Sequence, residues 1–536
     1  MNQLSETAGG ADNEKTFMGH PRGLSTLFFT EMWERFSYYG MRALLVLFMT
    51  APLYYLNPGS GLPNSEQVLG LGFDVGKATA IYGLYTAMVY LLALAGGWVA
   101  DNLWGQRKAV YRGGVIIAAG HFTMAAPLIG LPDVASFYGG LILIVLGTGL
   151  LKPNVSTMVG DLYPEPTEEE AERLEASDED AEDWGARRDA GFSIFYMGIN
   201  IGAILGPFIC SFLGEGYNFH WGFSIAGFGM LLGLFQYKRG AKYLGEAGKL
   251  KLDDDEETLR KRGKTFYTVT AVFAAALILF VFLATSGVMS ISLEAFATGL
   301  GYTIIALAIL YFVYLFVAGG YDAEQKKRLG AIVWLFILAA IFWSGFEQAG
   351  SSMNLFARDL TDRMIGNFEM PAGWLQNINP AFIVVFAPIF GYMWTWLAHR
   401  NANPSIPAKF AMGLLGLAAG FFVISWGAAN ASIENPVTPA WLIVTYFLHT
   451  CGELALSPVG LSSITKLAPK DRVGQMMGIW FIAAALGNLF AGLVAGSLES
   501  LEPSSLFRNV ALIIGGAGVV ALVVSPWMKK LMGKVK

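Results

Sequence analysis

A stretch of ten residues near the start of the chain places charged side chains inside a helix that otherwise reads as membrane-spanning. The segment from about residue 24 to 55 is apolar on both sides of these charges. At about 100° per residue, a stripe about 60° wide holds Glu31, Arg35, Tyr38 and Arg42. A charge at mid-bilayer costs at least ~2.5 kcal/mol, so such groups pair or face water and mark functional sites. The stripe therefore predicts passage of an ion or substrate rather than a salt-bridged packing contact.

The composition agrees with a membrane protein and excludes other classes. Hydrophobic residues make up 54% of the chain and charged residues 14%, against about 25% charged residues in soluble domains. The formal net charge of -5 over 536 residues argues against a nucleic-acid partner. Cys210 and Cys451 lie in apolar stretches and form neither a zinc spacing nor a disulfide framework. We expect no metal and no cofactor, and we expect the lipid bilayer as surroundings.

Apolar runs long enough to span ~30 Å of hydrocarbon recur along the whole chain. We therefore predict an all-α membrane protein with fourteen transmembrane helices. The predicted spans lie near residues 24–55, 77–102, 109–131, 135–161, 189–214, 219–237, 265–286, 293–318, 329–357, 375–399, 406–428, 438–466, 473–498 and 505–528.

Lysine and arginine are distributed unequally between the two sets of loops, which predicts the orientation. The polar residues 1–22 lack the layout of a signal peptide and are expected to stay in the cytoplasm. With that end inside, the basic loops are all cytoplasmic, so we expect both termini inside a multi-pass membrane protein. The cytoplasmic set holds Arg107, Lys108, Arg112, Arg187, Arg188, the residues from Lys238 to Lys264, Lys326, Lys327, Arg328, Arg400, Lys470, Arg472, Lys529 and Lys530, and the other set little more than Lys77, Arg358, Arg363 and Arg508.

Two longer connections interrupt the short turns and suggest how the chain is organised. Residues 162–189 carry an acidic run and are predicted to form a solvated surface loop. The charged connection after span six, the next two spans and a basic turn look like an insert, and removing the two spans leaves six plus six. We predict a cytoplasmic tail (1–23), a six-helix bundle (24–237), a linker with two inserted helices (238–328), a second six-helix bundle (329–528) and a basic tail (529–536).

The end of the second span carries an acid, a glycine turn and two bases that can clamp neighbouring helices on the cytoplasmic side. It reads Gly97-Trp-Val-Ala-Asp101-Asn102-Leu-Trp-Gly105-Gln-Arg107-Lys108. This resembles the loop signature of the major facilitator superfamily, although Asn102 stands where a base usually follows the aspartate.

The first-helix motif then becomes diagnostic. It reads Glu31-x-x-Glu34-Arg35-Phe-x-Tyr38-Tyr39-Gly40, with Arg42 two residues beyond. This resembles the signature of the proton-dependent oligopeptide transporters of the major facilitator superfamily. The pair of inserted helices resembles the prokaryotic branch, which implies the bacterial plasma membrane. Further matching segments are Phe195-Tyr196-x-x-Ile199-Asn200-x-Gly202-x-x-x-Gly206-Pro207, Leu151-Lys152-Pro153-Asn154-Val155-Ser156, Trp343-x-x-x-Glu347-Gln348, Asn379-Pro380 and Gly452-Glu453-x-x-x-Ser457-Pro458-Val459-Gly460-Leu461.

The resemblance implies a major facilitator fold that imports di- and tripeptides together with protons by alternating access. In that superfamily helices one, four, seven and ten line the cavity, and here each carries a charge near its middle. A zwitterionic peptide needs a carboxylate for its ammonium end and bases for its carboxylate end. Arg42 and Lys152 are expected to face the peptide carboxylate and Glu453 the amino group. An alternative is that Lys152 and Glu347 only form structural ion pairs.

Two sets of functional residues follow. For proton coupling we expect Glu31, Glu34, Arg35 and Glu347, with Arg35 held by the two acids of span one and Glu347 paired with Arg42 when the outer mouth is closed. For substrate binding we expect Tyr38, Tyr39, Arg42, Tyr90, Lys152, Asn200, Trp343, Asn379, Glu453 and Trp480.

One departure from the resemblance concerns histidine. Many relatives carry a histidine on the second helix where this chain has Gly83, which cannot titrate, so coupling should rest on carboxylates. His449 precedes Glu453 by one turn and could face the cavity, but we interpret it as a packing or hydrogen-bonding residue.

Other functions fit the sequence less well. The chain has no G-x-x-x-x-G-K-[ST] phosphate loop, so ATP-driven transport is unsupported and an ion gradient is the natural source of work. The same fold could carry another substrate, such as nitrate or a drug-like molecule, but the complete acid-acid-arginine motif favours peptides. A membrane enzyme would need a nucleophile or a metal cluster, and no grouping with ligand spacing occurs.

Overall fold

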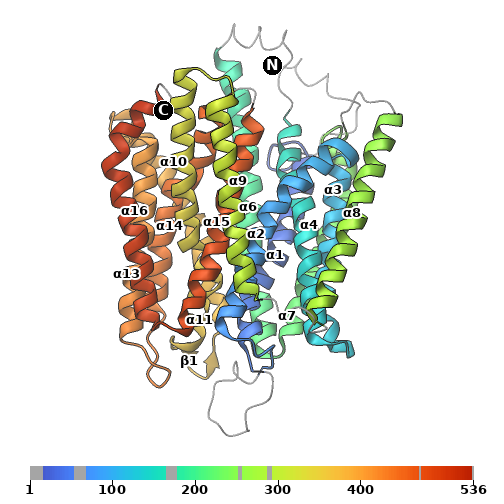
Figure 1. Ribbon diagram of the computed structural model, residues 1–536, viewed down its shortest axis with the longest axis vertical. Coiled ribbons are helices and arrows are strands. Elements are labelled where there is room, and N and C mark those ends of the chain that lie inside the picture. Colours follow the sequence, from blue (N-terminus) through green and yellow to red (C-terminus); the bar gives the residue numbers. More distant parts are fainter. Residues whose placement is uncertain are drawn as a thin grey trace.

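The computed structural model describes residues 16–52, 68–163, 178–250, 256–285, 292–469 and 472–533, and long helices running side by side dominate it (Figure 1). Helices suit a hydrocarbon environment because every backbone hydrogen bond is made within the segment. The long helices are α1 (Gly23–Thr50), α2 (Val75–Val99), α3 (Gln106–Ala125), α4 (Asp133–Asp161), α6 (Asp178–Gly216), α7 (Phe219–Gly240), α8 (Glu256–Thr285), α9 (Leu293–Ala318), α10 (Ala323–Phe346), α12 (Ile378–His399), α13 (Ile406–Ala429), α14 (Ala440–Leu467), α15 (Val473–Gly496) and α16 (Pro503–Met532).

Short elements connect or extend these helices. A π-helical turn, η2 (Ala100–Trp104), follows α2, and a two-stranded antiparallel hairpin pairs Met364 with Glu369 and Ile365 with Phe368. The other short elements are η3 (Ala126–Ile129), η4 (Ala241–Leu244), η5 (Glu347–Gly350), α11 (Ser352–Asp359), β1 (Met364–Ile365), β2 (Phe368–Glu369), η6 (Ala372–Asn377) and η8 (Ser497–Glu499).

Each predicted span corresponds to one long helix, which confirms the all-α membrane architecture. Within the described part of the chain, eleven helices are long and apolar enough to cross a membrane. The other three, α1, α7 and α8, have 28, 22 and 30 residues, so each exceeds the roughly 20 residues that a bilayer core requires. Among them, α1 carries the charges discussed above.

The helices pack as two groups. In the first group α1 packs along α6 and α7, and α3 packs along α4 and α7; in the second, α13 packs along α14 and α16, and α10 packs along α15 and α16. The two groups meet most extensively where α2 lies along α15. The inserted helix α9 contacts α2 and α15, so it lies at the seam between the groups, while α8 contacts the turn after α2.

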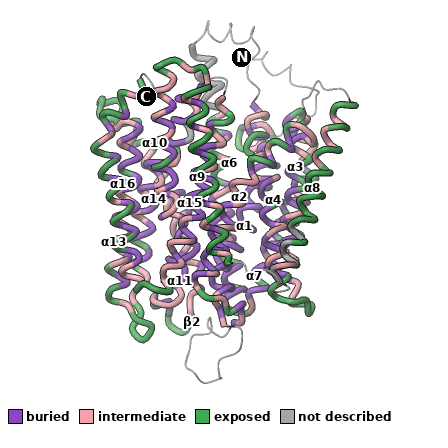
Figure 2. Tube along the Cα trace, viewed as in Figure 1, coloured by how far each residue is buried: buried purple, intermediate pink, exposed green. Residues whose placement is uncertain are grey.

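Glycines permit the close packing of α6 on α1. A Cβ atom on Gly202 would lie 2.2 Å from the Met32 carbonyl oxygen, and one on Gly206 would lie 2.4 Å from that of Phe36. On the outside of the molecule, exposed residues follow the outward faces of the helices (Figure 2). These faces include large apolar side chains such as Val317, which is 80% exposed, as expected for contact with lipid.

One predicted loop is partly wrong. We expected residues 162–189 to form a solvated loop, but α6 already begins at Asp178. The segment from residue 178 to 189 is rich in Ala, Glu and Arg, which favour helix, and its leading acidic residues suit a helix N-terminus. The helix therefore extends beyond the apolar span, and residues 164–177 lie outside the described residues.

The predicted clamp after the second span is present in a modified form. Gly105 makes the turn with a φ of 74°, in the region that favours glycine. Arg107 donates from Nε to the Ala247 carbonyl at 2.6 Å, and Asp101 accepts from Gln106 at 3.3 Å. The base therefore anchors the loop after η4.

The first helix begins and the last helix ends at the same end of the molecule, which we call the proximal end; the opposite end, which holds α11 and the β-hairpin, is the distal end (Figure 1). At the distal side α10 stops at Phe346 and gives way to the turn η5, followed by α11. This interruption places Glu347 at a helix break rather than in a continuous helix.

Candidate functional site

Glu31, Glu34 and Arg35 form a buried cluster in the middle of α1. Arg35 Nε lies 2.7 Å from Glu31 Oε1 and 3.0 Å from Glu34 Oε2, and none of the three residues is more than 5% exposed. The expected pairing of Arg35 with both acids is confirmed. Because two carboxylates share one guanidinium, the cluster has one negative charge in excess. Glu34 Oε1 has no hydrogen-bond partner among the described residues.

A second ion pair joins the two helix groups. Arg42 Nη2 lies 2.8 Å from Glu347 Oε2, and both side chains are buried. Arg42 Nε also donates to the Tyr82 hydroxyl at 2.7 Å, and that hydroxyl lies 3.5 Å from the Glu347 backbone oxygen, to which it donates. Tyr82 comes from α2 and Glu347 from η5, so three elements meet at one guanidinium. The predicted pairing of Glu347 with Arg42 is confirmed.

Lys152 lies on α4 near the acidic cluster of α1. Its side chain is half-buried, and Nζ lies 4.0 Å from the centroid of the Tyr90 ring, within the range of a cation–π contact. It is close enough to interact electrostatically with Glu31, Glu34, Arg35 and Glu347. The structure therefore brings together the charges of α1, α4 and η5.

Glu453 is positioned by an amide from a neighbouring helix. Asn379 Nδ2 donates to Thr450 Oγ1 at 2.9 Å and to Glu453 Oε2 at 3.2 Å. Thr450 and Glu453 are neighbours on one face of α14 because they are three residues apart. The carboxylate is half-buried, so it is held in place while part of it remains accessible.

Two tyrosines of α1 connect the charged groups. The Tyr38 ring stacks on Tyr85 of α2 with centroids 6.4 Å apart, and Arg42 Cζ lies 5.8 Å from the centre of the Tyr39 ring. Tyr39 is half-buried and is also close enough to interact electrostatically with Glu453. Tyr39 of α1 therefore lies within electrostatic range of Glu453 on α14 of the other helix group.

Three further predicted residues make mainly local contacts. Asn200 donates to the Tyr196 carbonyl of its own helix at 3.0 Å. Trp343 is half-buried one turn before Glu347, and its ring packs against neighbouring aromatic residues of α10. Trp480 is buried against Phe410 of α13. These contacts do not involve the charged groups above, so substrate binding by the three residues stays a prediction.

His449 and Gly83 both serve helix packing. The His449 ring is buried 4.8 Å from the Phe421 ring of α13, and a Cβ on Gly420 would lie 2.4 Å from His449 Cδ2. This confirms the interpretation of His449 as a packing residue. On α2, a Cβ on Gly83 would lie 2.9 Å from Gly492 Cα of α15, so this seam has no room for an imidazole.

Sequence analysis assigned no role in the site to four residues that complete the site and its distal side. Tyr82 directly precedes Gly83 on the second helix, and Thr450 precedes Glu453 by three residues. Asn354 Nδ2 donates to the Ala43 carbonyl at 2.8 Å, and Arg358 Nη1 donates to Thr50 Oγ1 at 2.6 Å. No pattern in one sequence assigns partners across the two groups.

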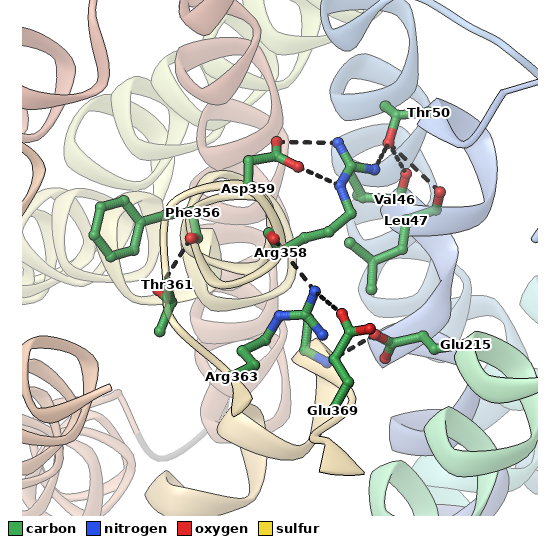
Figure 3. Close-up of polar contacts among 11 residues, drawn as sticks. Val46, Leu47, Thr50, Glu215, Phe356, Arg358, Asp359, Thr361, Arg363 and Glu369 are labelled. Carbon is green, nitrogen blue, oxygen red and sulfur yellow. Dashed lines mark hydrogen bonds and ion pairs between the residues drawn. The ribbon is translucent and has the colours of Figure 1, made fainter. Parts of the chain in front are cut away.

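These contacts fasten α11 to the end of α1. Figure 3 shows Arg358 lying between the carboxylate of Asp359 and the hydroxyl of Thr50, which itself bonds to the backbone of α1. Together with the Arg42–Glu347 pair, they join the two helix groups in the distal half. The structure therefore represents a state in which the distal end is closed.

Comparisons with known proteins find a matching family model and similar sequences. The sequence model of the POT family matches residues 107–507. The peptide transporter YePEPT of Yersinia enterocolitica is 40% identical, over 100% of this chain and 99% of the relative. A di-/tripeptide transporter of Lactococcus lactis subsp. cremoris is 35% identical, over 98% of this chain and 99% of the relative.

Solved structures of similar proteins share the fold. A peptide transporter POT in complex with sulfate superposes with a TM-score of 0.82 and 37% identity, covering 97% of each chain. A POT family transporter in complex with a thioalcohol-conjugated peptide gives a TM-score of 0.80 and 32% identity, covering 96% of this chain and 98% of the other.

Proposed function

Because the chain belongs to the POT family, we propose that it imports di- and tripeptides together with protons by alternating access. Residues 24–237 and 329–528 act as the two moving bundles, joined by the linker and inserted helices of residues 238–328. The terminal segments 1–23 and 529–536 lie in the cytoplasm, so the proximal end faces inward. The excess of lysine and arginine in the loops predicted to be cytoplasmic supports this orientation.

One observation carries the choice of substrate: a half-buried carboxylate, Glu453, and a half-buried ammonium, Lys152, lie on helices of opposite bundles. The free ends of a short peptide are an ammonium and a carboxylate, so such a ligand pairs with both groups at once. Arg42 adds a second base for the peptide carboxylate, and Tyr38, Tyr39 and Trp343 offer aromatic surfaces for varied side chains. Recognition then depends on the charged ends of the peptide rather than on its particular side chains.

A charge count supports coupling to protons. The carboxylates of the site are Glu31, Glu34, Glu347 and Glu453, and the cations are Arg35, Arg42 and Lys152, so one negative charge is in excess. A zwitterionic peptide has no net charge and cannot balance it. A proton on one of the carboxylates does, and burial favours that neutral form. A proton crossing 100 mV of membrane potential supplies ~2.3 kcal/mol for accumulation.

We assign the gating step to the Arg42–Glu347 pair. It joins the bundles at 2.8 Å in the distal-closed state, so the distal end opens only when this pair separates. Protonation of Glu347 removes its charge and with it the attraction that holds the pair. Glu31 and Glu34 hold the second candidate proton position, because only one guanidinium serves both acids.

A second candidate is the same mechanism with a peptide-like ligand. A POT family transporter that is 32% identical, with a TM-score of 0.80 and coverage of 96% of this chain, was solved in complex with 5-aminolevulinic acid. That compound also carries an amine and a carboxylate. A site that reads the two charged ends would accept both kinds of molecule.

Uptake into proteoliposomes tests the proposal. With an imposed inward proton gradient, labelled dialanine should accumulate and the lumen should acidify, while a proton ionophore should abolish accumulation. N-acetyl-dialanine amide, which lacks both charged ends, should compete poorly. Dipeptide uptake that is indifferent to the ionophore would contradict proton coupling, and equal competition by the blocked peptide would contradict recognition of the ends.

A further inference from the structure

Two glutamates at the distal end reach from one bundle to the start of a helix in the other. Glu215, at the end of α6, accepts from the backbone N–H groups of Ala372 at 2.7 Å and Gly373 at 2.9 Å, the first residues of η6. Glu499, in the turn η8 after α15, accepts from the N–H of Gly76 in the first turn of α2 at 2.6 Å. Such N–H groups lack partners within their own helix, and a carboxylate satisfies them with favourable charge.

The two contacts are related by the internal symmetry of the fold. Helices α6 and α15 are each the fifth long helix of their bundle, while α2 and α12, which η6 precedes, are each the second. The fifth helix of each bundle thus caps the second helix of the other. The halves of a major facilitator protein are related by an axis along the membrane normal, so the contacts occupy equivalent places on both sides of that axis.

Each contact depends on a glycine at the capped end. A Cβ on Gly373 would lie 3.1 Å from Glu215 Oε1 and 2.0 Å from Ser211 Oγ. A Cβ on Gly76 would lie 3.1 Å from Glu499 Oε2. The same solution at both places, a carboxylate opposite a glycine in the first turn, indicates a specific contact rather than chance proximity.

The contact made by Glu215 is more buried and has more hydrogen bonds than the contact made by Glu499. Glu215 is 3% exposed and binds with both oxygens, whereas Glu499 is exposed and binds through one. Beside Glu215, Trp374 Nε1 donates to the Phe208 carbonyl of α6 at 2.8 Å, and the rings of these two residues stack with centroids 4.4 Å apart. In the same region Arg363 pairs with Glu369 across the hairpin that leads into η6 (Figure 3).

We propose that Glu215 and Glu499 are positioning residues of the transport cycle, which hold the distal end closed and must both release before it opens. The proposal rests on the alternating-access mechanism above. Every hydrogen bond of either carboxylate to these helix starts crosses between the bundles, so separation of the bundles breaks both contacts. Neither glutamate belongs to the charged site, so both should govern the balance between states rather than substrate recognition.

Distance measurements between spin labels on the two bundles test this directly. The labels replace Ile129 in η3 and Ile433 in the loop after α13, two distal residues that are 83% and 75% exposed, in a full-length background in which serine replaces Cys210 and Cys451. The variants are Glu215→Gln, Glu499→Gln and the double variant, measured without peptide. The matched control is Glu502→Gln, a nearby distal glutamate at the start of α16 whose side chain makes no capping hydrogen bond.

Glu215→Gln should raise the ratio of long to short distances about tenfold or more, because a hydrogen bond to a charged group is among the strong ones and the amide NH2 would face a backbone N–H. Glu499→Gln should raise it by a smaller factor, and the factors should multiply in the double variant because the two contacts share no residue. Glu502→Gln should leave the distances unchanged. Gly373→Ala, which leaves both carboxylates in place, should act in the same direction as Glu215→Gln.

Three outcomes would overturn the proposal. One is an unchanged distance distribution in both single variants. Another is an equal shift in Glu502→Gln, which would mean a general effect of distal charge. The third is a lowered melting temperature with no shift in distance, which would mean a purely structural role. Because the distances are measured without peptide, they report on the Glu215 and Glu499 contacts even if labelled dialanine proves not to be the substrate.

Discussion

Replacing Tyr82 by phenylalanine should shift the transporter towards its distal-open state. The Tyr82 hydroxyl accepts from Arg42 Nε at 2.7 Å and lies 3.5 Å from the Glu347 carbonyl. Both partners are buried in the closed state. The contact to Glu347 crosses between the bundles, whereas Arg42 and Tyr82 belong to the same bundle. Opening of the distal end admits water, which can replace the hydroxyl at Arg42, so loss of the hydroxyl should destabilise the closed state more than the open one. The variant keeps the ring and its packing, so it removes only the interactions of the hydroxyl.

The size of the effect follows from the kind of bond that is lost. A hydrogen bond to a charged group contributes about 1.5–3 kcal/mol, and loss of its partner leaves the Arg42 Nε donor buried and unsatisfied. Since 1.4 kcal/mol corresponds to a tenfold change in an equilibrium constant, the ratio of open to closed molecules should rise about 10- to 150-fold. The longer contact to the carbonyl should add little, because it is at the limit of hydrogen-bond distance.

The same spin labels at positions 129 and 433 measure this ratio. Tyr85→Phe is a matched control, because Tyr85 is also buried on α2, one turn further on, and its hydroxyl has no hydrogen-bond partner among the described residues. The control should leave the distance distribution as it is in the parent protein. A Tyr82→Phe distribution that matches the control, or one that moves towards shorter distances, would refute the reasoning.

Four further results are expected. Glu453→Gln should weaken binding of dialanine at least tenfold in a competition assay but leave binding of N-acetyl-dialanine unchanged; equal losses would remove the assignment of Glu453 to the amino end. Lys152→Gln should likewise weaken binding of dialanine more than binding of dialanine amide, which lacks the carboxylate. The reverse order would contradict a role for Lys152 at the peptide carboxylate. Gly83→His, which restores the histidine of other relatives, should lower the melting temperature, because overpacking costs about 1–3 kcal/mol and the Cβ alone would lie 2.9 Å from Gly492 Cα; unchanged stability would show that the seam can widen. His449→Ala should retain ionophore-sensitive uptake, and loss of proton coupling with normal folding would assign the proton to span ten.

The sequence was sufficient to predict the helices because hydrocarbon imposes a simple rule on composition and length. Each apolar run contains one long helix, although the run 329–357 is interrupted at η5. Charge in a helix interior was equally informative: Glu31, Glu34 and Arg35 are neighbours on one helix, so their pairing follows from helical geometry alone. Local rules therefore predicted local contacts.

Contacts between helices that are distant in the sequence could not be predicted in the same way. Tyr82 is one of 21 tyrosines, and nothing in its neighbours states that its hydroxyl meets a guanidinium from α1. The pairing of Arg42 with Glu347 was predicted only because the family resemblance placed both helices at one cavity. Glu215 and Glu499 were missed for a further reason: each binds backbone N–H groups, which every residue except proline possesses, so no partner residue type marks the contact.

The structure links the absence of a histidine at Gly83 of α2 to the position of the carboxylate that we propose for proton coupling. At Gly83 the second helix approaches α15 so closely that backbone meets backbone, and this seam is part of what closes the distal end. A titratable side chain there would keep the bundles apart. Glu347 instead lies at a helix break directly opposite Arg42, where its charge is stabilised only while the distal end is closed. Proton binding to Glu347 and opening of the distal end must then favour each other equally, because linkage between two equilibria is reciprocal. In the mechanism proposed above, a carboxylate at this place couples the proton to the conformational change without any imidazole, because separation of the bundles would remove its partner Arg42.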